Sequence, residues 1–295
     1  MTKMKNLNNF IVMTRNRKIN YFPKYDKLNF IEKFFLNTCC YFPPRPRRKI
    51  DANNELDLSK HKNTFKSAFG KNILNDLENC KVLDFGCGEG GFSLMLASEL
   101  NNSKIVGIDI FDRLDIVKKK INDAEQMNNI EFVIGSSNKL LENSFDYVFT
   151  HDSFEHFENP QGILAEMVRL VKPGGNILIK FGPTWLGPYG RHMGGTIKKT
   201  RPWVHLLFSE KTIMRVHSVY HNRNKLYSEY KDLEGGLNKM TIKKAFKIIH
   251  SFNDCEVLES EIKYLWKGEN FNKIPLLNEL FSSSLFVKLS KNPII

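Results

Sequence analysis

The sequence predicts an α/β fold built on a parallel sheet, and two observations lead to that prediction. Short apolar runs typical of buried strands alternate with segments of helical periodicity from about residue 65 to residue 183. A glycine-rich turn at residues 86–91 directly follows the first of these runs. Strands that alternate with helices form βαβ units, whose right-handed crossovers produce a parallel sheet.

The individual elements follow from the spacing of the apolar residues. Strands are expected at residues 81–85, 104–109, 130–134, 145–151 and 176–181. Helices are expected at residues 65–78, 92–100, 114–127 and 161–171. The rhythm then stops, and residues 184–240 form a long insertion of the kind that usually carries function. Regular structure resumes with helices at residues 241–250 and 275–281 and strands at residues 255–262 and 285–289.

Composition excludes several classes of protein. The chain has 295 residues, of which 41% are hydrophobic, so a disordered chain is excluded. It has no apolar run of about 18 residues, the length that a membrane-spanning helix needs. The five cysteines are an odd number, and Cys87 lies in the glycine-rich turn, which disfavours a disulfide scaffold. Because the N-terminus also has no secretion signal, we expect a cytoplasmic protein.

The positive charge is concentrated near the N-terminus. Residues 1–50 hold twelve Lys or Arg and two acidic residues, while the whole chain has a net charge of +12, so the rest is close to neutral. We therefore divide the chain into a basic, aromatic arm, residues 1–64, and a body, residues 65–295. Apolar residues at positions 30, 31, 34 and 35 predict an amphipathic helix in the arm. This helix either packs on the body or lies on an anionic membrane surface as a peripheral contact of residues 1–50.

The glycine-rich turn has a spacing that indicates its ligand. It follows G-x-G-x-G rather than the G-x-G-x-x-G that holds a dinucleotide pyrophosphate, and Asp84 precedes it by two residues. An acid at that place repels a pyrophosphate and suits a cationic amino group. The next strand ends on Asp109, where a carboxylate accepts both hydroxyls of a ribose. One acid for an amine and one for a ribose describe S-adenosylmethionine (SAM).

These motifs resemble the class I SAM-dependent methyltransferases, strongly over residues 65–183 and more loosely over residues 241–290. The resemblance rests on Asp-x-Gly-Cys-Gly-x-Gly at residues 84–90, Asp109, Glu155-His156 and the Lys-Pro-Gly-Gly turn at residues 172–175. It implies a Rossmann-like, seven-stranded, mostly parallel sheet with a reversed last strand and helices on both faces. It also implies the following SAM-binding residues: Asp84, Gly86, Cys87, Gly88, Asp109, Ile110, Ser136 and His151.

Within that set, the resemblance assigns parts of the cofactor to particular residues. It implies that Asp84 holds the methionine amine, that Asp109 binds the ribose and that Ile110 packs on the adenine. Ser136 departs from the family pattern, because the family often has an acid after the third strand and this side chain carries no charge.

Transfer of a methyl group to a hydroxyl group requires alignment of the reactants and a general base, for which histidine is suited near neutral pH. Six of the eight histidines lie between residues 151 and 221. His192, in the Gly/Pro-rich segment after the fifth strand, is the first candidate for the base, followed by His156 and His151. A helix beginning at residue 152 would place Asp152, Glu155 and His156 on one face, so a metal site there is a lesser alternative to a structural role.

The insertion is expected to bind the methyl acceptor. The candidate acceptor-binding residues are Trp185, Tyr189, Arg191, His192 and His205. Arg191 and Arg201 are candidates for contact with an anionic group on the acceptor.

Three functions remain open at this point. Residues 203–210 and 235–241 resemble methyltransferases of glycan and lipopolysaccharide biosynthesis, which favours O-methylation of a sugar hydroxyl in a glycan or a lipid- or nucleotide-linked precursor. The alternatives are O-methylation of a quinone or another lipophilic molecule at the membrane surface, and a SAM-fold partner protein without catalysis. The nearly neutral body disfavours a nucleic-acid partner, and the sequence does not indicate the oligomeric state.

Overall fold

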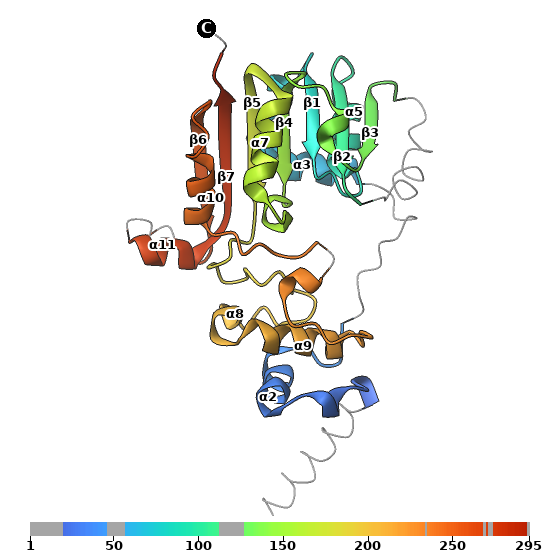
Figure 1. The fold of residues 1–295 in the computed structure, drawn as a ribbon, viewed down its shortest axis with the longest axis vertical. Coiled ribbons are helices and arrows are strands. Elements are labelled where there is room, and N and C mark those ends of the chain that lie inside the picture. Colours follow the sequence, from blue (N-terminus) through green and yellow to red (C-terminus); the bar gives the residue numbers. More distant parts are fainter. Residues whose placement is uncertain are drawn as a thin grey trace, which may run out of the picture.

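The computed structural model describes residues 20–45, 57–111, 127–233, 235–267, 270 and 274–293 (Figure 1). The helix expected at residues 114–127 lies almost entirely outside these residues, as does most of the basic cluster of the arm. Among the described residues, no helix is both long enough and apolar enough to cross a membrane.

Seven strands form one sheet in the order β3-β2-β1-β4-β5-β7-β6. The strands β1 to β5 pair in parallel, and β7 runs antiparallel to both β5 and β6. The predicted fold, a mostly parallel sheet of seven strands with a reversed last strand, is therefore confirmed. The strand bounds are β1 (Lys81–Phe85), β2 (Lys104–Asp109), β3 (Ile130–Ile134), β4 (Phe145–His151), β5 (Val171–Phe181), β6 (Cys255–Tyr264) and β7 (Ser282–Lys291).

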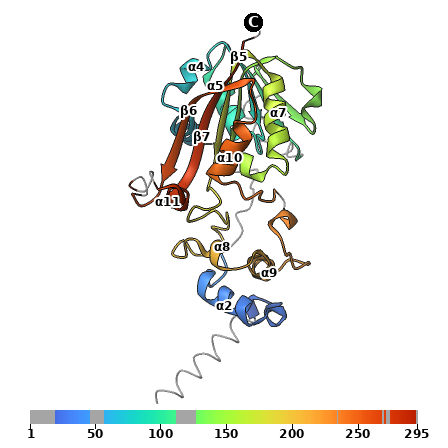
Figure 2. The same ribbon diagram turned by 60° about the vertical axis from the view of Figure 1, so that its left-hand side comes forward.

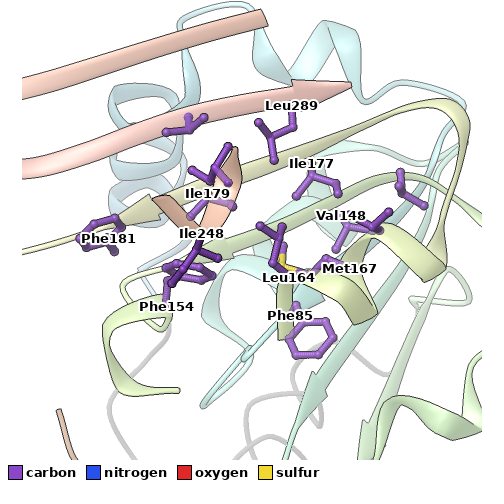
Figure 3. Close-up of a cluster of buried hydrophobic side chains, with 14 of the residues drawn as sticks. Phe85, Val148, Phe154, Leu164, Met167, Ile177, Ile179, Phe181, Ile248 and Leu289 are labelled. Atoms are coloured by element: carbon purple, nitrogen blue, oxygen red, sulfur yellow. The ribbon is translucent and has the colours of Figure 1, made fainter. Parts of the chain in front are cut away.

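Neighbouring residues of a strand point to opposite faces of the sheet, and both faces carry buried apolar side chains. Helices therefore cover both faces. One face, with Val82, packs against α3 (Leu58–Phe69), α4 (Ile73–Asp76) and α5 (Gly91–Glu99). The other face, with Leu83, packs against α7 (Pro160–Leu170) and α10 (Ile242–Ile249). Figure 3 shows this second core, in which Leu164, Met167 and Ile248 lie over Val148, Ile177 and Ile179. The helix α11 (Pro275–Phe281) connects β6 to β7.

The first expected helix, residues 65–78, was wrong in its bounds. The helix α3 begins earlier, at Leu58, because the side chain of Asp57 accepts a hydrogen bond from the Lys60 amide at 2.9 Å and caps it. It ends at Phe69, because the next residue, Gly70, has a φ of +111°, a conformation that favours glycine, and the separate short helix α4 follows. The expected boundary between arm and body, at residue 64, therefore falls inside α3.

The arm and the insertion together form a second unit at the carboxyl edge of the parallel strands (Figures 1 and 2). Its helices are α2 (Phe30–Cys39), α8 (Val204–Leu207) and α9 (Glu210–Tyr220), with the short helices η1 (Tyr25–Lys27) and η5 (Tyr230–Asp232). Phe35 and Leu36 of α2 are buried with Ile213 and Met214 of α9 in a core separate from the two cores of the sheet. The expected helix of the arm is therefore present, and one of its faces packs on the insertion.

Candidate active site

A cleft of about 2090 Å³ runs along the carboxyl edge of the sheet, where ligands of open α/β sheets bind. Its wall includes the turn after β1, the ends of β2 and β4, the segment after β3 and the loop at residues 235–238. All eight residues expected to bind the cofactor line this one cleft. They come from segments far apart in the chain and meet because the strands are parallel.

The glycine turn brings backbone close to the cleft. Gly86 has a φ of +82°, and a Cβ added there would come within 3.0 Å of the Ser153 side chain, so a larger residue does not fit. The amides of Gly86 and Cys87 both donate to the carbonyl of Ile108, at 2.8 and 3.0 Å. The Gly88 amide donates to a carboxylate oxygen of Asp109 at 2.8 Å. The turn is thus held against the end of β2.

Asp84 is a buried acid at the wall of the cleft. Its side chain is 2% exposed, and Oδ2 accepts a hydrogen bond from the Ser93 hydroxyl at 2.7 Å. Burial raises the pKa of Asp84 to about 7, because the charged form loses its hydration. A carboxylate in this setting gains a partner when a cationic amine enters the cleft.

The remaining residues of the expected cofactor site have the chemistry that a nucleoside needs. Asp109 accepts from the amides of Gly88 and Phe111, which orients its carboxylate and leaves lone pairs for hydroxyl donors. Ile110 is 75% exposed within the cleft wall, as expected of an apolar surface that a ring covers. The Ser136 hydroxyl accepts from the Asn138 amide, and burial lowers the pKa of His151.

The segment after β4 does not form the helix expected from residue 152. Only Phe154–His156 are helical, as the short 3-10 helix η4, and Asp152 has a φ of +50° outside it. Glu155 points into the interior, where Oε1 accepts from the Gly182 amide at 3.1 Å and Oε2 is buried without a hydrogen-bond partner. Burial raises the pKa of Glu155 to about 8, and the nearby Asp152 carboxylate adds to the effect.

His156 and His192 meet at the boundary between the cleft and the insertion. Their rings are 5.4 Å apart, centre to centre, and nearly perpendicular. His156 Nδ1 donates to the carbonyls of Gly235 and Gly236 at 2.6 and 2.8 Å, and His192 Nε2 donates to the Pro183 carbonyl at 2.9 Å. Each ring therefore keeps its second nitrogen as a hydrogen-bond acceptor while it is neutral.

Two further features distinguish His192. Its φ of +56° is uncommon for a residue with a side chain, and such backbone outliers cluster at functional sites. Burial lowers the pKa of His192 to about 4, and the neighbouring His156 acts in the same direction. The imidazole is therefore neutral at physiological pH, which is the form that accepts a proton.

The same residues form the one group in the described part of the chain with the spacing of metal ligands. One atom each from Glu155, His156 and His192 lie within 4.8 Å of one another. Asp152, which the sequence placed in such a site with Glu155 and His156, is not a member of this group. The two histidines donate to carbonyls, as metal-bound histidines commonly do, so these three side chains could hold a divalent ion.

The other expected acceptor residues are dispersed. Trp185 and His205 pack on each other within the insertion, with ring centres 4.9 Å apart. Neither residue lines the cofactor cleft or the smaller cavity beside it. The Tyr189 hydroxyl donates to the Lys199 carbonyl, and the exposed Arg201 donates to the Thr38 carbonyl. Arg191 lines a second, smaller cavity next to His156 and His192.

Sequence reasoning missed Lys180 and Asn238. Lys180 lies 3.8 Å from the Asp152 carboxylate, and a lysine within an otherwise apolar strand was a signal that could have revealed it. The Asn238 side chain donates to the carbonyls of Phe154 and Phe157, both at 2.9 Å. That side chain joins the insertion to η4, a role that the pattern at residues 235–241 did not indicate.

Comparison with known proteins identifies the part of the chain that holds strands β1 to β5. A family described as a methyltransferase domain matches residues 76–183. The demethylmenaquinone methyltransferase of Oceanobacillus iheyensis is 33% identical over 44% of this chain and 56% of its own length. An uncharacterised methyltransferase of Schizosaccharomyces pombe is 31% identical over 34% of this chain and 39% of its own length. Residues 76–183 therefore form a methyltransferase domain. The predicted family and cofactor are thereby confirmed for this domain.

Two solved structures share the fold over most of the chain. The PH0226 protein of Pyrococcus horikoshii is 19% identical, with a TM-score of 0.50 over 80% of this chain and 94% of that one. The [4+2]-cyclase SpnF is 12% identical, with a TM-score of 0.50 over 86% of this chain and 88% of that one. Because one of these proteins is named a cyclase, the fold by itself does not establish methyl transfer, which depends on the side chains of the site.

The raised pKa of Asp84 predicts that SAM binding depends on pH. Above pH 7 the carboxylate is charged and attracts the cofactor amine, whereas below pH 7 it is protonated and the attraction is lost. The dissociation constant should therefore rise about tenfold per pH unit as the pH falls below 7. Asp84→Asn should bind SAM weakly at every pH, and calorimetry at pH 5.5 to 8 measures both effects.

Asp254→Asn serves as the matched control, because it removes an exposed carboxylate remote from the cleft wall. This variant should keep the pH dependence of the wild type. Equal SAM affinity at pH 5.5 and pH 8 in the wild type would contradict the assignment of Asp84.

Proposed function

We propose that the protein is a SAM-dependent O-methyltransferase whose acceptor is a sugar hydroxyl in a glycan or in a lipid- or nucleotide-linked precursor. One observation carries the proposal. His156 and His192 face each other where the cofactor cleft meets the insertion, each has one ring nitrogen fixed by a carbonyl, and burial lowers the pKa of His192 to about 4, so this imidazole is neutral. A preoriented neutral imidazole is the group that a hydroxyl acceptor needs as a base.

The chain's own residues have separate roles in this reaction. SAM, when bound, supplies an electrophilic methyl group. Asp84 and Asp109 hold its amine and ribose, and the turn at residues 86–90 brings backbone against it. His192 receives the hydroxyl proton on Nδ1, because its Nε2 is bonded to Pro183. His156 either orients the acceptor or accepts the proton in place of His192. His151 remains the third candidate for the general base.

Methyl transfer is tested directly with labelled SAM in a fractionated lysate of the host. The wild type should label a glycan or a lipid- or nucleotide-linked sugar fraction, and Asp84→Asn should not. Label in RNA or protein would contradict the proposed acceptor. Absence of label in every fraction, with SAM bound normally, would favour a partner protein without catalysis.

His192→Ala should lower kcat by about 10²–10⁴-fold while SAM affinity stays unchanged, since the variant removes the base and leaves the cofactor cleft intact. Steady-state kinetics and SAM calorimetry measure the two effects. A change in KM alone would make His192 a binding residue. Loss of activity in EDTA, with recovery in Mg²⁺, would instead assign Glu155, His156 and His192 to a metal ion.

A second candidate acceptor is a quinone or another lipophilic molecule at the membrane surface. The curated relative from Oceanobacillus iheyensis is named a demethylmenaquinone methyltransferase, and it is similar to 44% of this chain. The outer face of α2 also supports membrane contact, because Phe30, Ile31 and Phe34 are 84%, 56% and 52% exposed. Three exposed apolar residues on one helix face suit an interfacial position.

Membrane contact predicts that replacing Phe30, Ile31 and Phe34 together by serine weakens binding to anionic liposomes about tenfold or more, because three apolar side chains no longer enter the interface. Cosedimentation measures the binding. Serine at Leu141 and Leu258, exposed apolar residues of the sheet unit, is the control and should have no effect. Unchanged liposome binding in the α2 variant would contradict membrane contact through α2.

A further inference from the structure

A second cavity, of about 340 Å³, lies between the insertion and the arm. Its volume is at the lower end of the range for small-ligand sites. Three arginines line it: Arg45 comes from the arm, and Arg191 and Arg223 come from the insertion. His156 lines both this cavity and the cofactor cleft, so the two spaces adjoin.

The cavity is strongly cationic. Among its described lining residues there is no aspartate or glutamate. In the described part of the chain, no carboxylate forms an ion pair with Arg45, Arg191 or Arg223. The three arginines therefore line one cavity without an acidic partner in the described part of the chain, whereas buried or clustered arginines usually have one.

Two of the guanidinium groups also have unused donors. Arg191 is 1% exposed and donates to the carbonyls of Pro188 and Lys198, yet its Nε has no hydrogen-bond partner. Arg223 Nε and the Tyr230 hydroxyl are likewise buried without a hydrogen-bond partner. A buried donor without an acceptor is costly to folding, and a ligand with several oxygens removes that cost.

Arg45 is positioned by contacts that leave its charge available. Its backbone amide donates to the Tyr220 hydroxyl at 2.9 Å, and its guanidinium stacks on the Tyr41 ring at 3.5 Å. Stacking orients the planar group and leaves its N–H edge for an anion.

The nearby negative groups are too weak to cancel the positive charge of the three arginines. The C-terminal end of α9, which ends at Tyr220, carries about half a negative charge. Glu210 accepts from the Tyr230 amide but is paired with Lys239 at 2.5 Å. Three positive charges exceed these contributions, so the cavity favours an anionic ligand.

We propose that this cavity binds the phosphate or diphosphate group of the methyl acceptor, an inference that rests on the proposed O-methyltransferase function. Guanidinium groups bind phosphate oxygens through paired, charge-assisted hydrogen bonds. Because the cavity adjoins His156 and His192, a phosphate held there leaves the rest of the acceptor to extend toward the methyl group. The acceptor class is therefore a phosphorylated sugar, and the arm forms part of its binding site.

The experiment measures binding of pyrophosphate to the full chain by calorimetry. Pyrophosphate should bind the wild type, and Arg45→Gln and Arg223→Gln should each weaken binding about 10- to 100-fold. Lys211→Gln removes the same charge from an exposed position of α9 outside the cavity and should bind like the wild type. SAM affinity, measured in parallel, should be unchanged in all three variants.

Three competitors identify the source of the phosphate: UDP for a nucleotide-linked sugar, farnesyl diphosphate for a lipid-linked one, and glucose 1-phosphate for a free sugar phosphate. The compound that binds more tightly than pyrophosphate identifies the class, and equal affinities would support recognition of phosphate alone. Absence of pyrophosphate binding, an equal loss in Lys211→Gln, or wild-type affinity in the arginine variants would overturn the proposal.

The labelling experiment separates this inference from the function on which it rests. Methyl transfer to a sugar fraction, with pyrophosphate bound equally by wild type and arginine variants, would overturn the anion site alone. The predicted pattern of pyrophosphate binding without methyl transfer would leave the anion site standing and overturn the proposed function.

Discussion

The hydrogen bonds between η4 and the loop at residues 235–238 connect the two units of the molecule. The Asn238 amide group donates to Phe154 and Phe157, its backbone donates to the Glu155 carbonyl at 2.9 Å, and His156 donates to Gly235 and Gly236. These bonds fix the end of the insertion beside the carboxyl edge of the sheet. His156, Gly236 and Leu237, which these bonds hold or adjoin, line both the cofactor cleft and the arginine-lined cavity.

This arrangement separates two tasks between the units. The sheet unit supplies the cofactor cleft from strand ends and a glycine turn, a solution available to any parallel sheet of this order. In the proposed reaction the unit of arm and insertion supplies the acceptor side, through His192 and three arginines on a framework with its own core. The arm is thus part of the framework of the candidate active site, and its buried Glu32 pairs with Arg215 of α9 at 2.7 Å.

The predictability of each part follows from the range of its interactions. The position of the glycine turn, Asp84 and Asp109 in one cleft could be predicted because it depends on spacing within single βαβ units. The bounds of α3 could not, since an Asp57 cap and Gly70 outweighed the apolar pattern. The placement of Asp152 on one helix face with Glu155 and His156 was wrong. Asp152 has a left-handed backbone conformation and lies outside the short helix η4. Arg45 and Arg223 line the same cavity only because of tertiary packing, which no local pattern encodes.

The most direct test of this account is a crystal structure of the full chain with S-adenosylhomocysteine, the product of the cofactor. We expect the amine of the product at Asp84, the ribose at Asp109 and the sulfur facing the gap between His156 and His192. A product bound with its sulfur directed away from both histidines, or with its amine remote from Asp84, would contradict the account.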